Sequence, residues 1–306
     1  MKNIVLKLDN VSKSFKGKTV VKNISFEVCE GDIFGFLGPN GSGKTTTIRM
    51  ILNLLKPDSG KIYICGYNNQ KDFIKAIKNI GATIETPKFY PYLTGEENLN
   101  IMAKLSNLDS NKVIDTLNIV GLSENKDKKF CNYSLGMKQR LGIGNALLSS
   151  PKVIILDEPT NGLDPKGIKE IRDLIVNLSK EKNITFIIST HLLYEVEQIC
   201  NKVAILNNGS IIKQDYVNNL INSEYEEIAL HIDSKNETET ILSSLDYVNS
   251  FKKVSYGFEV SILKDSSSKL ILSLIKNNIN IKYVIPIKKS LEDIYMSLTN
   301  KENLND

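Results

Sequence analysis

A short glycine-rich stretch, GPNGSGKTT at residues 38–46, constrains this chain more than any other feature of its sequence. It follows an apolar, strand-like segment at residues 32–37 and precedes a helix-like segment that begins with threonines. The pattern G-x-x-x-x-G-K-T between a strand and a helix is typical of a loop that wraps backbone N–H groups around a phosphate chain. The sequence therefore predicts an α/β protein with a phosphate-binding loop.

The residue types in this loop have separate physical roles. Gly41 and Gly43 free the backbone to turn its N–H groups toward phosphate, and the helix that begins near Gly43 adds the positive end of its dipole. Lys44 is expected to reach the β- and γ-phosphates, and the hydroxyl of Thr45 to hold Mg²⁺. A glycine-rich turn without function is the alternative, but the lysine, the threonine and the flanking elements argue against it. The predicted nucleotide-binding residues of the loop are Gly38, Pro39, Asn40, Gly41, Ser42, Gly43, Lys44, Thr45 and Thr46.

Two acidic residues end the apolar segment VIILDEPT, residues 153–160. Asp157 lies at the end of the expected strand, where its carboxylate can hold the Mg²⁺ shell. Glu158 follows directly and can orient and deprotonate an attacking water. Two acids at a strand end are common when they occur alone. Together with a phosphate loop they predict hydrolysis of a nucleotide.

A further candidate site lies in CNYSLGMKQRLG, residues 131–142. Ser134 is a candidate N-cap of a helix, and Gly136 permits a close approach of another molecule to the backbone. Such a helix N-terminus suits a phosphate group. The signal is weak by itself, because capped helices are common.

The order of strand-like and helix-like segments divides the chain into regions. Residues 1–218 alternate the two, which predicts a mixed, largely parallel sheet. Within them, residues 94–149 contain three helix-like segments and no strand, the first opening with a capping box at Thr94, so a helical subdomain is expected there. Residues 222–306 follow the order β-α-β-β-α-β of ferredoxin-like domains, with one more helix from Ser290. This part is expected to be a small α+β accessory domain.

Composition excludes several classes of protein. The 306 residues include 39 basic and 35 acidic side chains, with a net charge of +4, and only three of the basic residues are arginines. No basic cluster is present, so nucleic acid is not an expected partner. The four cysteines are far apart and are expected to be buried, reduced thiols of a cytosolic protein. No apolar run approaches the roughly 18 residues of a spanning helix, so work at a membrane would need a partner.

The motifs occur in the order found in the ATP-binding subunit of ABC transporters, which the chain resembles over roughly residues 1–215. The set comprises the phosphate loop, YSLGM at 133–137, VIILDE at 153–158, NGLD at 161–164 and the histidine of STHLL, His191. The resemblance implies an ABC-type P-loop ATPase fold, with ATP and Mg²⁺ as cofactors. It also implies a homodimer that closes head to tail around two ATP molecules.

The resemblance assigns further roles in that dimer. Ser134 and Gly136 would contact the γ-phosphate held by the opposite subunit. The family usually has LSGGQ at this place; here Leu135 replaces the first glycine and Met137 the glutamine, which leaves the serine and the second glycine. Asp164 would help to couple the two ATP sites.

The resemblance also implies roles for one histidine and one phenylalanine. His191 would touch the γ-phosphate, and its alternative is a histidine that caps a helix. Phe15 would stack on adenine, and its alternative is a phenylalanine of the core. The catalytic residues implied are Lys44, Glu158 and His191.

Glu85 ends a strand-like segment at residues 80–84, where the family usually has a glutamine whose carbonyl oxygen ligates Mg²⁺. A carboxylate keeps an oxygen for the metal, adds a negative charge and loses the amide donor. Glu85 thus joins Thr45 and Asp157 as a predicted Mg²⁺ ligand; the alternative is a strand cap in solvent. This glutamate and the stretches ETPKFYPYLTGEENL and SLEDIYMSLT resemble the ATPases of lantibiotic-immunity and bacitracin-resistance exporters.

The resemblance implies an ATPase that powers a membrane exporter, with antimicrobial peptides as the expected substrate. Separate permease subunits would dock near Glu85–Tyr92 and hold this chain at the cytoplasmic face of the cell membrane as a peripheral subunit. The exported peptide would contact the permease rather than this chain. One alternative is an ABC-2 type exporter of another substrate. Another is a non-transport ABC ATPase, which a single phosphate loop and the lack of sustained heptads disfavour.

Overall fold

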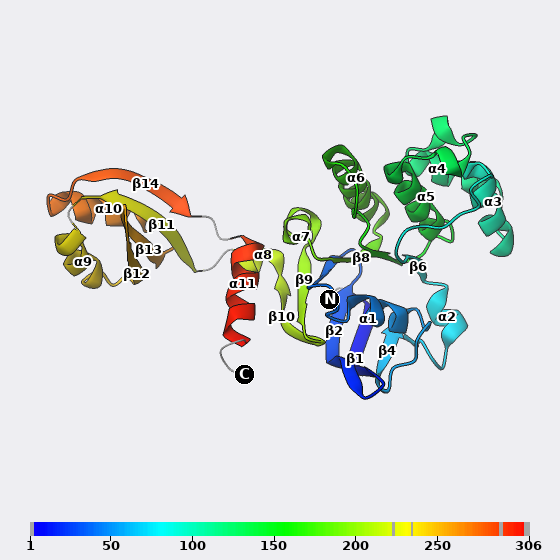
Figure 1. Ribbon diagram of the computed structural model, residues 1–306, viewed down its shortest axis with the longest axis horizontal. Coiled ribbons are helices and arrows are strands. Elements are labelled where there is room, and N and C mark those ends of the chain that lie inside the picture. Colours follow the sequence, from blue (N-terminus) through cyan, green and yellow to red (C-terminus); the bar gives the residue numbers. More distant parts are fainter. Residues whose placement is uncertain (1–2, 222–223, 234, 288–289, 303–306) are drawn as a thin grey trace. The chain divides into compact units, whose positions relative to one another are not determined.

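The computed structural model of the chain describes residues 3–221, 224–233, 235–287 and 290–302. It forms two compact units, Met1–Tyr216 and Val217–Asp306, which are considered separately (Figure 1). The boundary expected between residues 218 and 222 lies just beyond this division. The assignment of nucleotide binding to the first part and an accessory role to the second stays a prediction.

A six-stranded sheet in the order β10-β9-β3-β8-β7-β6 forms the centre of the first unit. Neighbouring strands are parallel except for the pair β9 and β10. Strands β3 and β7 are buried at every position, as expected for strands covered on both faces. The predicted mixed, largely parallel sheet is therefore confirmed. Its strands are β3 (Ile33–Leu37), β6 (Ile80–Thr83), β7 (Val153–Asp157), β8 (Thr185–Thr190), β9 (Lys202–Asn207) and β10 (Ser210–Tyr216).

A second, fully antiparallel sheet has the order β2-β1-β4-β5. The sequence does not predict this sheet, because a hydrophobic pattern marks a strand but does not name its partner. Residues 1–218 were expected to contribute a mixed, largely parallel sheet, and this additional antiparallel sheet was not expected. Its strands are β1 (Ile4–Phe15), β2 (Lys18–Cys29), β4 (Ser59–Ile64) and β5 (Tyr67–Asn68).

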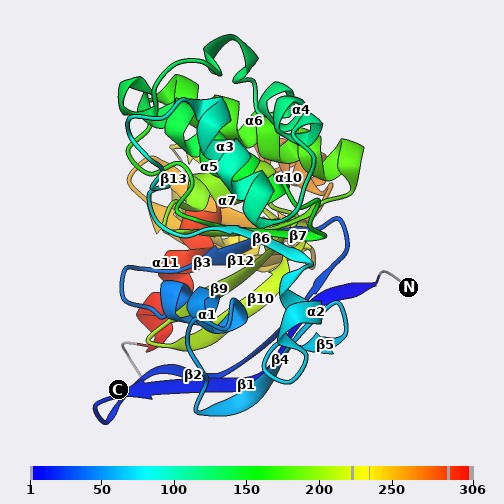
Figure 2. The ribbon, with the colours of Figure 1, turned by 90° about the vertical axis from the view of Figure 1, so that its right-hand side faces the viewer.

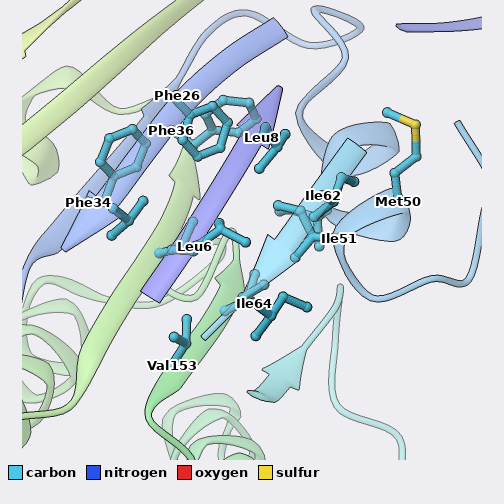
Figure 3. Close-up of a cluster of buried hydrophobic side chains, with 14 of the residues drawn as sticks. Leu6, Leu8, Phe26, Phe34, Phe36, Met50, Ile51, Ile62, Ile64 and Val153 are labelled. Carbon is cyan, nitrogen blue, oxygen red and sulfur yellow. The ribbon is translucent and has the colours of Figure 1, made fainter. Parts of the chain in front are cut away.

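Side chains from both sheets and from helix α1 (Lys44–Ile51) form one buried cluster (Figure 3). The rings of Phe26 on β2 and Phe34 on β3 stack with their centroids 5.1 Å apart, which joins the two sheets directly. Ile48 and Ile51 bring α1 into the same cluster. This packing fixes the start of α1, and with it the phosphate loop.

Most of the helices of the first unit lie on the other side of the six-stranded sheet from the antiparallel sheet (Figure 2). Thr94 caps α3 (Gly95–Leu105) and forms the predicted capping box with Glu97. The three helices expected within residues 94–149 are all present. Besides α1, the helices of the first unit are α2 (Phe73–Ile77), beside the antiparallel sheet, and α3 (Gly95–Leu105), α4 (Asn111–Ile119), α5 (Leu135–Leu147), α6 (Pro165–Lys182) and α7 (Leu193–Ile199), with 3-10 turns at Ser123–Asn125 and Phe130–Asn132.

The second unit has the predicted order β-α-β-β-α-β and its own apolar core. Its antiparallel sheet runs β12-β13-β11-β14. Ser290 precedes the last helix as expected and bonds the carboxylate of Asp293. The elements are α8 (Val217–Ile221), β11 (Tyr225–Ile232), α9 (Lys235–Ser243), β12 (Val248–Val254), β13 (Gly257–Leu263), α10 (Ser267–Lys276), β14 (Ile281–Ile287) and α11 (Leu291–Glu302).

Two expectations from composition concern the whole chain. All four thiols are free, but only Cys200 is buried and Cys131 is exposed, so the expectation of four buried cysteines is wrong. A lone residue carries no periodic pattern from which burial is predictable. Across the described ranges, no helix combines the length and the apolar character that crossing a bilayer requires.

Candidate active site

The phosphate loop connects β3 to α1, as the sequence predicts. Gly43 precedes the helix with φ +104°, a conformation that side chains disfavour. A Cβ on Gly43 would also lie 2.9 Å from the carbonyl oxygen of Val20, and one on Gly38 would lie 2.6 Å from that of Leu206. Glycine is thus required at both ends of the loop, where neighbouring backbone approaches closely.

The ammonium group of Lys44 is held inside this loop. Its Nζ donates to the carbonyl oxygen of Gly38 at 2.7 Å and lies 3.8 Å from Oε1 of Glu158. Burial lowers the pKa of Lys44, while the negative charges of Glu158 and Asp157 oppose that shift. The hydroxyl of Ser42 is buried and has no hydrogen-bond partner within the described part of the chain. A phosphate oxygen at this loop would supply that missing partner and meet the charge of Lys44.

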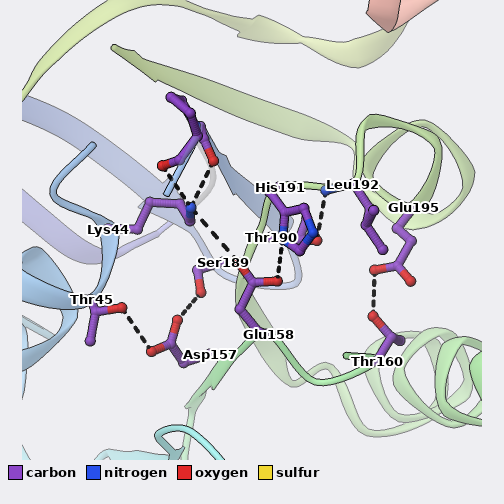
Figure 4. A network of polar contacts seen from close by, with 12 residues as sticks. Lys44, Thr45, Asp157, Glu158, Thr160, Ser189, Thr190, His191, Leu192 and Glu195 are labelled. Atoms are coloured by element: carbon purple, nitrogen blue, oxygen red, sulfur yellow. Dashed lines mark hydrogen bonds and ion pairs between the residues drawn. The ribbon is translucent and has the colours of Figure 1, made fainter. Parts of the chain in front are cut away.

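Asp157 ends strand β7 beside the start of α1 (Figure 4). Its Oδ2 accepts a hydrogen bond from the hydroxyl of Thr45 at 3.1 Å, and its Oδ1 accepts one from the hydroxyl of Ser189. The described residues assemble no group of three or more acidic, histidine or cysteine side chains suited to a metal. Mg²⁺ typically takes one or two protein oxygens together with waters and phosphate oxygens. A hydroxyl and a carboxylate side by side therefore fit that ion.

Glu158 and His191 face each other at the carboxyl ends of β7 and β8. Nδ1 of His191 lies 2.9 Å from Oε2 of Glu158, and the backbone N–H of Glu158 donates to the carbonyl oxygen of Ser189 at 3.0 Å. Glu158 has φ +50°, which is uncommon for a residue with a side chain and concentrates at functional sites. No side chain caps α7, so the histidine does not have the capping role considered as an alternative.

The structure pairs Glu85 with an arginine that the sequence analysis did not consider. Nη2 of Arg49 lies 3.0 Å from Oε1 of Glu85, whose side chain is 64% exposed. Glu85 nevertheless lines the same hollow as Thr45, Asp157 and Glu158. Its place is therefore compatible with a metal ligand, and that role stays a prediction.

Phe15 lies on β1 with 44% of its surface exposed, so it is not a core residue. The ammonium of Lys13 lies 5.6 Å from the centroid of its ring. An exposed aromatic face is available for stacking on a base. The contact with adenine stays a prediction.

The signature segment shows its predicted cap. The hydroxyl of Ser134 accepts from the backbone N–H of Met137 at 3.2 Å at the start of α5. A Cβ on Gly136 would meet a single atom, of Leu163, at 3.9 Å, so packing in this protomer does not require glycine there. Asp164 caps α6 by accepting from the backbone N–H of Gly167 at 2.9 Å. The contacts of these residues with a second subunit stay predictions.

One polar pair at this site was missed entirely. The hydroxyl of Thr160 donates to Oε2 of Glu195 at 2.6 Å (Figure 4). Glu195 lies on α7, 35 positions after Thr160, so no local pattern in the sequence identifies the two as partners.

Comparison with known proteins agrees with this geometry. A family model described as ABC transporter matches residues 21–161. The bacitracin transport ATP-binding protein BcrA of Bacillus licheniformis is 39% identical over 296 residues, which is 96% of this chain and 97% of BcrA. This chain belongs to the ABC transporter ATP-binding protein family. The lantibiotic transport ATP-binding protein SrtF of Streptococcus pyogenes is 36% identical over 68% of the chain and 89% of its own length.

Solved structures of ABC ATP-binding subunits share the fold. The cbiO1 subunit from Clostridium perfringens, part of the cbiONQ transporter complex, has a TM-score of 0.66 and 30% identity, over 71% of this chain and 90% of its own. The bacterial cassette MJ0796, solved as a dimer, has a TM-score of 0.63 and 27% identity, over 69% of this chain and 98% of its own. Subunits of this family bind ATP, dimerise and work with transmembrane permeases. The chain is accordingly an ATPase subunit that powers transport.

Proposed function

We propose that this chain energises the export of antimicrobial peptides from the cytoplasmic face of the cell membrane, attached through separate permease subunits. The main support is similarity to bacitracin transport ATP-binding proteins along almost the whole chain. Besides the Bacillus licheniformis protein, that of Enterococcus faecalis is 35% identical over 96% of the chain. The match extends through the C-terminal unit, which lies beyond the motifs that ABC ATPases share.

A second candidate is export of another antimicrobial compound. The linearmycin resistance ATP-binding protein LnrL of Bacillus subtilis is 34% identical over 97% of this chain. A relative that is similar along almost the whole chain is thus named for a different compound. The peptide is favoured because the bacitracin proteins are the more similar.

The site supports hydrolysis by a general base. Oε2 of Glu158 is held by His191, which leaves Oε1 on the side of Lys44, 3.8 Å from its ammonium. A carboxylate held in this way is oriented toward the phosphate loop and can take a proton from the attacking water. Mg²⁺ held by Thr45 and Asp157 would neutralise charge on the phosphates.

Dimer formation is proposed through the signature segment. Ser134 and Leu135 are exposed at the start of α5, and Gly136 is not required by the packing of its own chain. These features suit a surface that is completed by the ATP of a second subunit. Binding of two ATP molecules would close the dimer, and hydrolysis would reopen it.

The permease is proposed to dock beside Glu85–Tyr92. Tyr90 and Tyr92 are 62% and 79% exposed. Phe89 instead points into the helical subdomain, where its ring meets that of Phe130 edge-on with 5.3 Å between centroids. The loop is thereby anchored at Phe89 and presents two tyrosines outward, and exposed aromatic side chains are typical of protein interfaces.

The test compares resistance of host cells that lack the gene with cells that carry wild type or Glu158→Gln at equal protein levels. Growth is measured against bacitracin, a lantibiotic and linearmycin. We expect wild type, but not Glu158→Gln, to restore resistance to a peptide. The purified variant should bind ATP, hydrolyse it at least 100-fold more slowly and accumulate as a dimer on gel filtration.

Each outcome addresses a separate part of the proposal. Restored resistance to linearmycin alone would show that the substrate is linearmycin rather than a peptide. Unchanged sensitivity to all three compounds would refute this class of substrate, while the ATPase assignment would stand. Wild-type turnover by Glu158→Gln would remove Glu158 from the mechanism.

A further inference from the structure

A buried polar contact joins the loop after Glu158 to the helix after His191. The hydroxyl of Thr160 donates to Oε2 of Glu195 at 2.6 Å, and the two residues are only 4% and 5% exposed. Thr160 belongs to the segment that leaves β7, and Glu195 lies on α7 (Figure 4). The contact therefore links the two segments that supply the predicted base and its histidine.

Two other contacts join the same segments closer to the sheet. One is the backbone bond from Glu158 to Ser189, and the other is the Glu158–His191 pair itself. Neither of them holds α7, since both lie before its first residue. Among the described residues, the hydrogen bond from Thr160 to Glu195 joins α7 itself to this loop.

The surroundings of Glu195 indicate that its carboxyl group has a role other than filling space in the core. Its second oxygen, Oε1, is buried and has no hydrogen-bond partner among the residues that the structure describes. Burial raises the pKa of Glu195, although the bond from Thr160 and the positive charge of Arg172 act in the opposite direction. A buried acceptor without a partner costs stability, and an apolar side chain would avoid that cost.

The same threonine also anchors the loop that leads to Asp164. The backbone N–H of Leu163 donates to the carbonyl oxygen of Thr160 at 3.1 Å, and Asp164 follows as the cap of α6. A displacement of Thr160 would therefore shift the turn on which Asp164 depends. The Thr160–Glu195 bond lies at the junction of this turn, the loop of Glu158 and helix α7.

We propose that Glu195 is a positioning residue for ATP hydrolysis. Through Thr160 it fixes α7, and with it His191, against the loop that carries Glu158. It acts through these residues and does not touch the reacting atoms. The inference rests on the proposed role of Glu158 as the base.

The test uses the full-length chain with Glu195→Ala, Glu195→Gln, Thr160→Val and the double variant Glu195→Ala/Thr160→Val. The kcat and the KM for Mg-ATP are measured for each. Misplacing a catalytic group by about 1 Å costs on the order of 100-fold in rate, so kcat of Glu195→Ala should fall by at least roughly tenfold. KM should stay within about twofold, because the phosphate loop is untouched.

The conservative variants distinguish positioning from a merely structural role. Glu195→Gln keeps an oxygen that accepts from Thr160 and should retain most of kcat. Thr160→Val keeps the shape of threonine without its hydroxyl and should match Glu195→Ala. The double variant should be no slower than the slower single variant, because residues that act as one unit are not additive.

Three results would each overturn the proposal: wild-type kcat in Glu195→Ala, a Glu195→Gln variant as slow as Glu195→Ala, or fully additive losses. If Glu195→Ala does not fold, wild-type kcat in Thr160→Val would overturn it and a loss with unchanged KM would support it. Glu158→Gln is assayed in parallel. Wild-type turnover in that variant would refute the role of Glu158 itself, which keeps the two failures distinguishable.

Discussion

The guanidinium of Arg49 lies 3.0 Å from the carboxylate of Glu85. Arg49 is in the last turn of α1, the helix that begins with Lys44, and Glu85 follows β6 in the loop proposed to face the permease. The ion pair thus links the phosphate-loop helix to that docking loop. Both side chains are at least half exposed, so the pair contributes only about 0–1 kcal/mol of stability. The pair places the Glu85 carboxylate beside the last turn of α1.

This relationship yields a prediction about the metal. If Glu85 ligates Mg²⁺, Glu85→Ala should raise the Mg²⁺ concentration that gives half-maximal ATPase, whereas Glu85→Gln keeps an oxygen and should raise it less. Arg49→Gln removes the guanidinium that competes with Mg²⁺ for the Glu85 carboxylate. This variant should therefore not raise the Mg²⁺ concentration that gives half-maximal ATPase. The control is Lys126→Gln, which removes a partly exposed ion pair with Glu96 elsewhere in the subunit. If Glu85→Ala has the Mg²⁺ dependence of the wild type and confers the same resistance, Glu85 is only a strand cap in solvent.

Phe15→Ala should weaken ATP binding, because the exposed ring is the proposed platform for adenine. Loss of one base–aromatic stack costs roughly 1–3 kcal/mol, which predicts an increase of about 5- to 150-fold in Kd. Phe15→Tyr keeps an aromatic face and should bind nearly as wild type. Phe73→Ala removes a comparably exposed ring from α2 and serves as the control. Calorimetric titration with ATP checks this, and equal Kd values for Phe15→Ala and wild type would rule out stacking.

Local features of the sequence predicted local features of the structure. The phosphate loop, the caps at Thr94 and Ser134, and the apolar strand that ends at Asp157 each depend on residues within a few positions of one another, so their patterns are sufficient. The pairing of strands is not local. Strands β1 and β4 lie on either side of the phosphate loop in sequence, and nothing in their patterns shows that they pair with each other.

The same distinction applies to the site. The motifs predicted that four residues belong to the site, and the structure brings them together: Lys44, Asp157, Glu158 and His191. The pairs Arg49–Glu85 and Thr160–Glu195 join residues more than thirty positions apart. Such partners are determined by how β6, α1 and α7 pack in three dimensions, which no single segment of sequence encodes.

Gly81→Ala should destabilise the first unit. A Cβ on this glycine of β6 would lie 1.9 Å from the backbone carbonyl oxygen of Ala146 on α5, so the strand and the helix would have to separate. Overpacking that forces backbone to move costs roughly 3 kcal/mol or more. Gly17→Ala is the control: it has open space but φ +82°, and should cost about 1 kcal/mol. Hydrogen exchange of the β6 and α5 amides measures the difference, and equal protection in the two variants would contradict the predicted clash.

Deletion of residues 222–306 should leave ATP binding intact. Every predicted nucleotide-binding residue lies in the first unit, and the second unit has a separate apolar cluster. Helix α8 contacts α11, so a chain that ends at Ile221 keeps α8 but loses its partner. A second deletion, of residues 217–306, removes both helices and should be the more soluble of the two. Calorimetry should give both truncated chains the Kd of the full chain for ATP. A truncated chain that is soluble and folded yet binds no ATP would show that nucleotide binding needs the C-terminal unit.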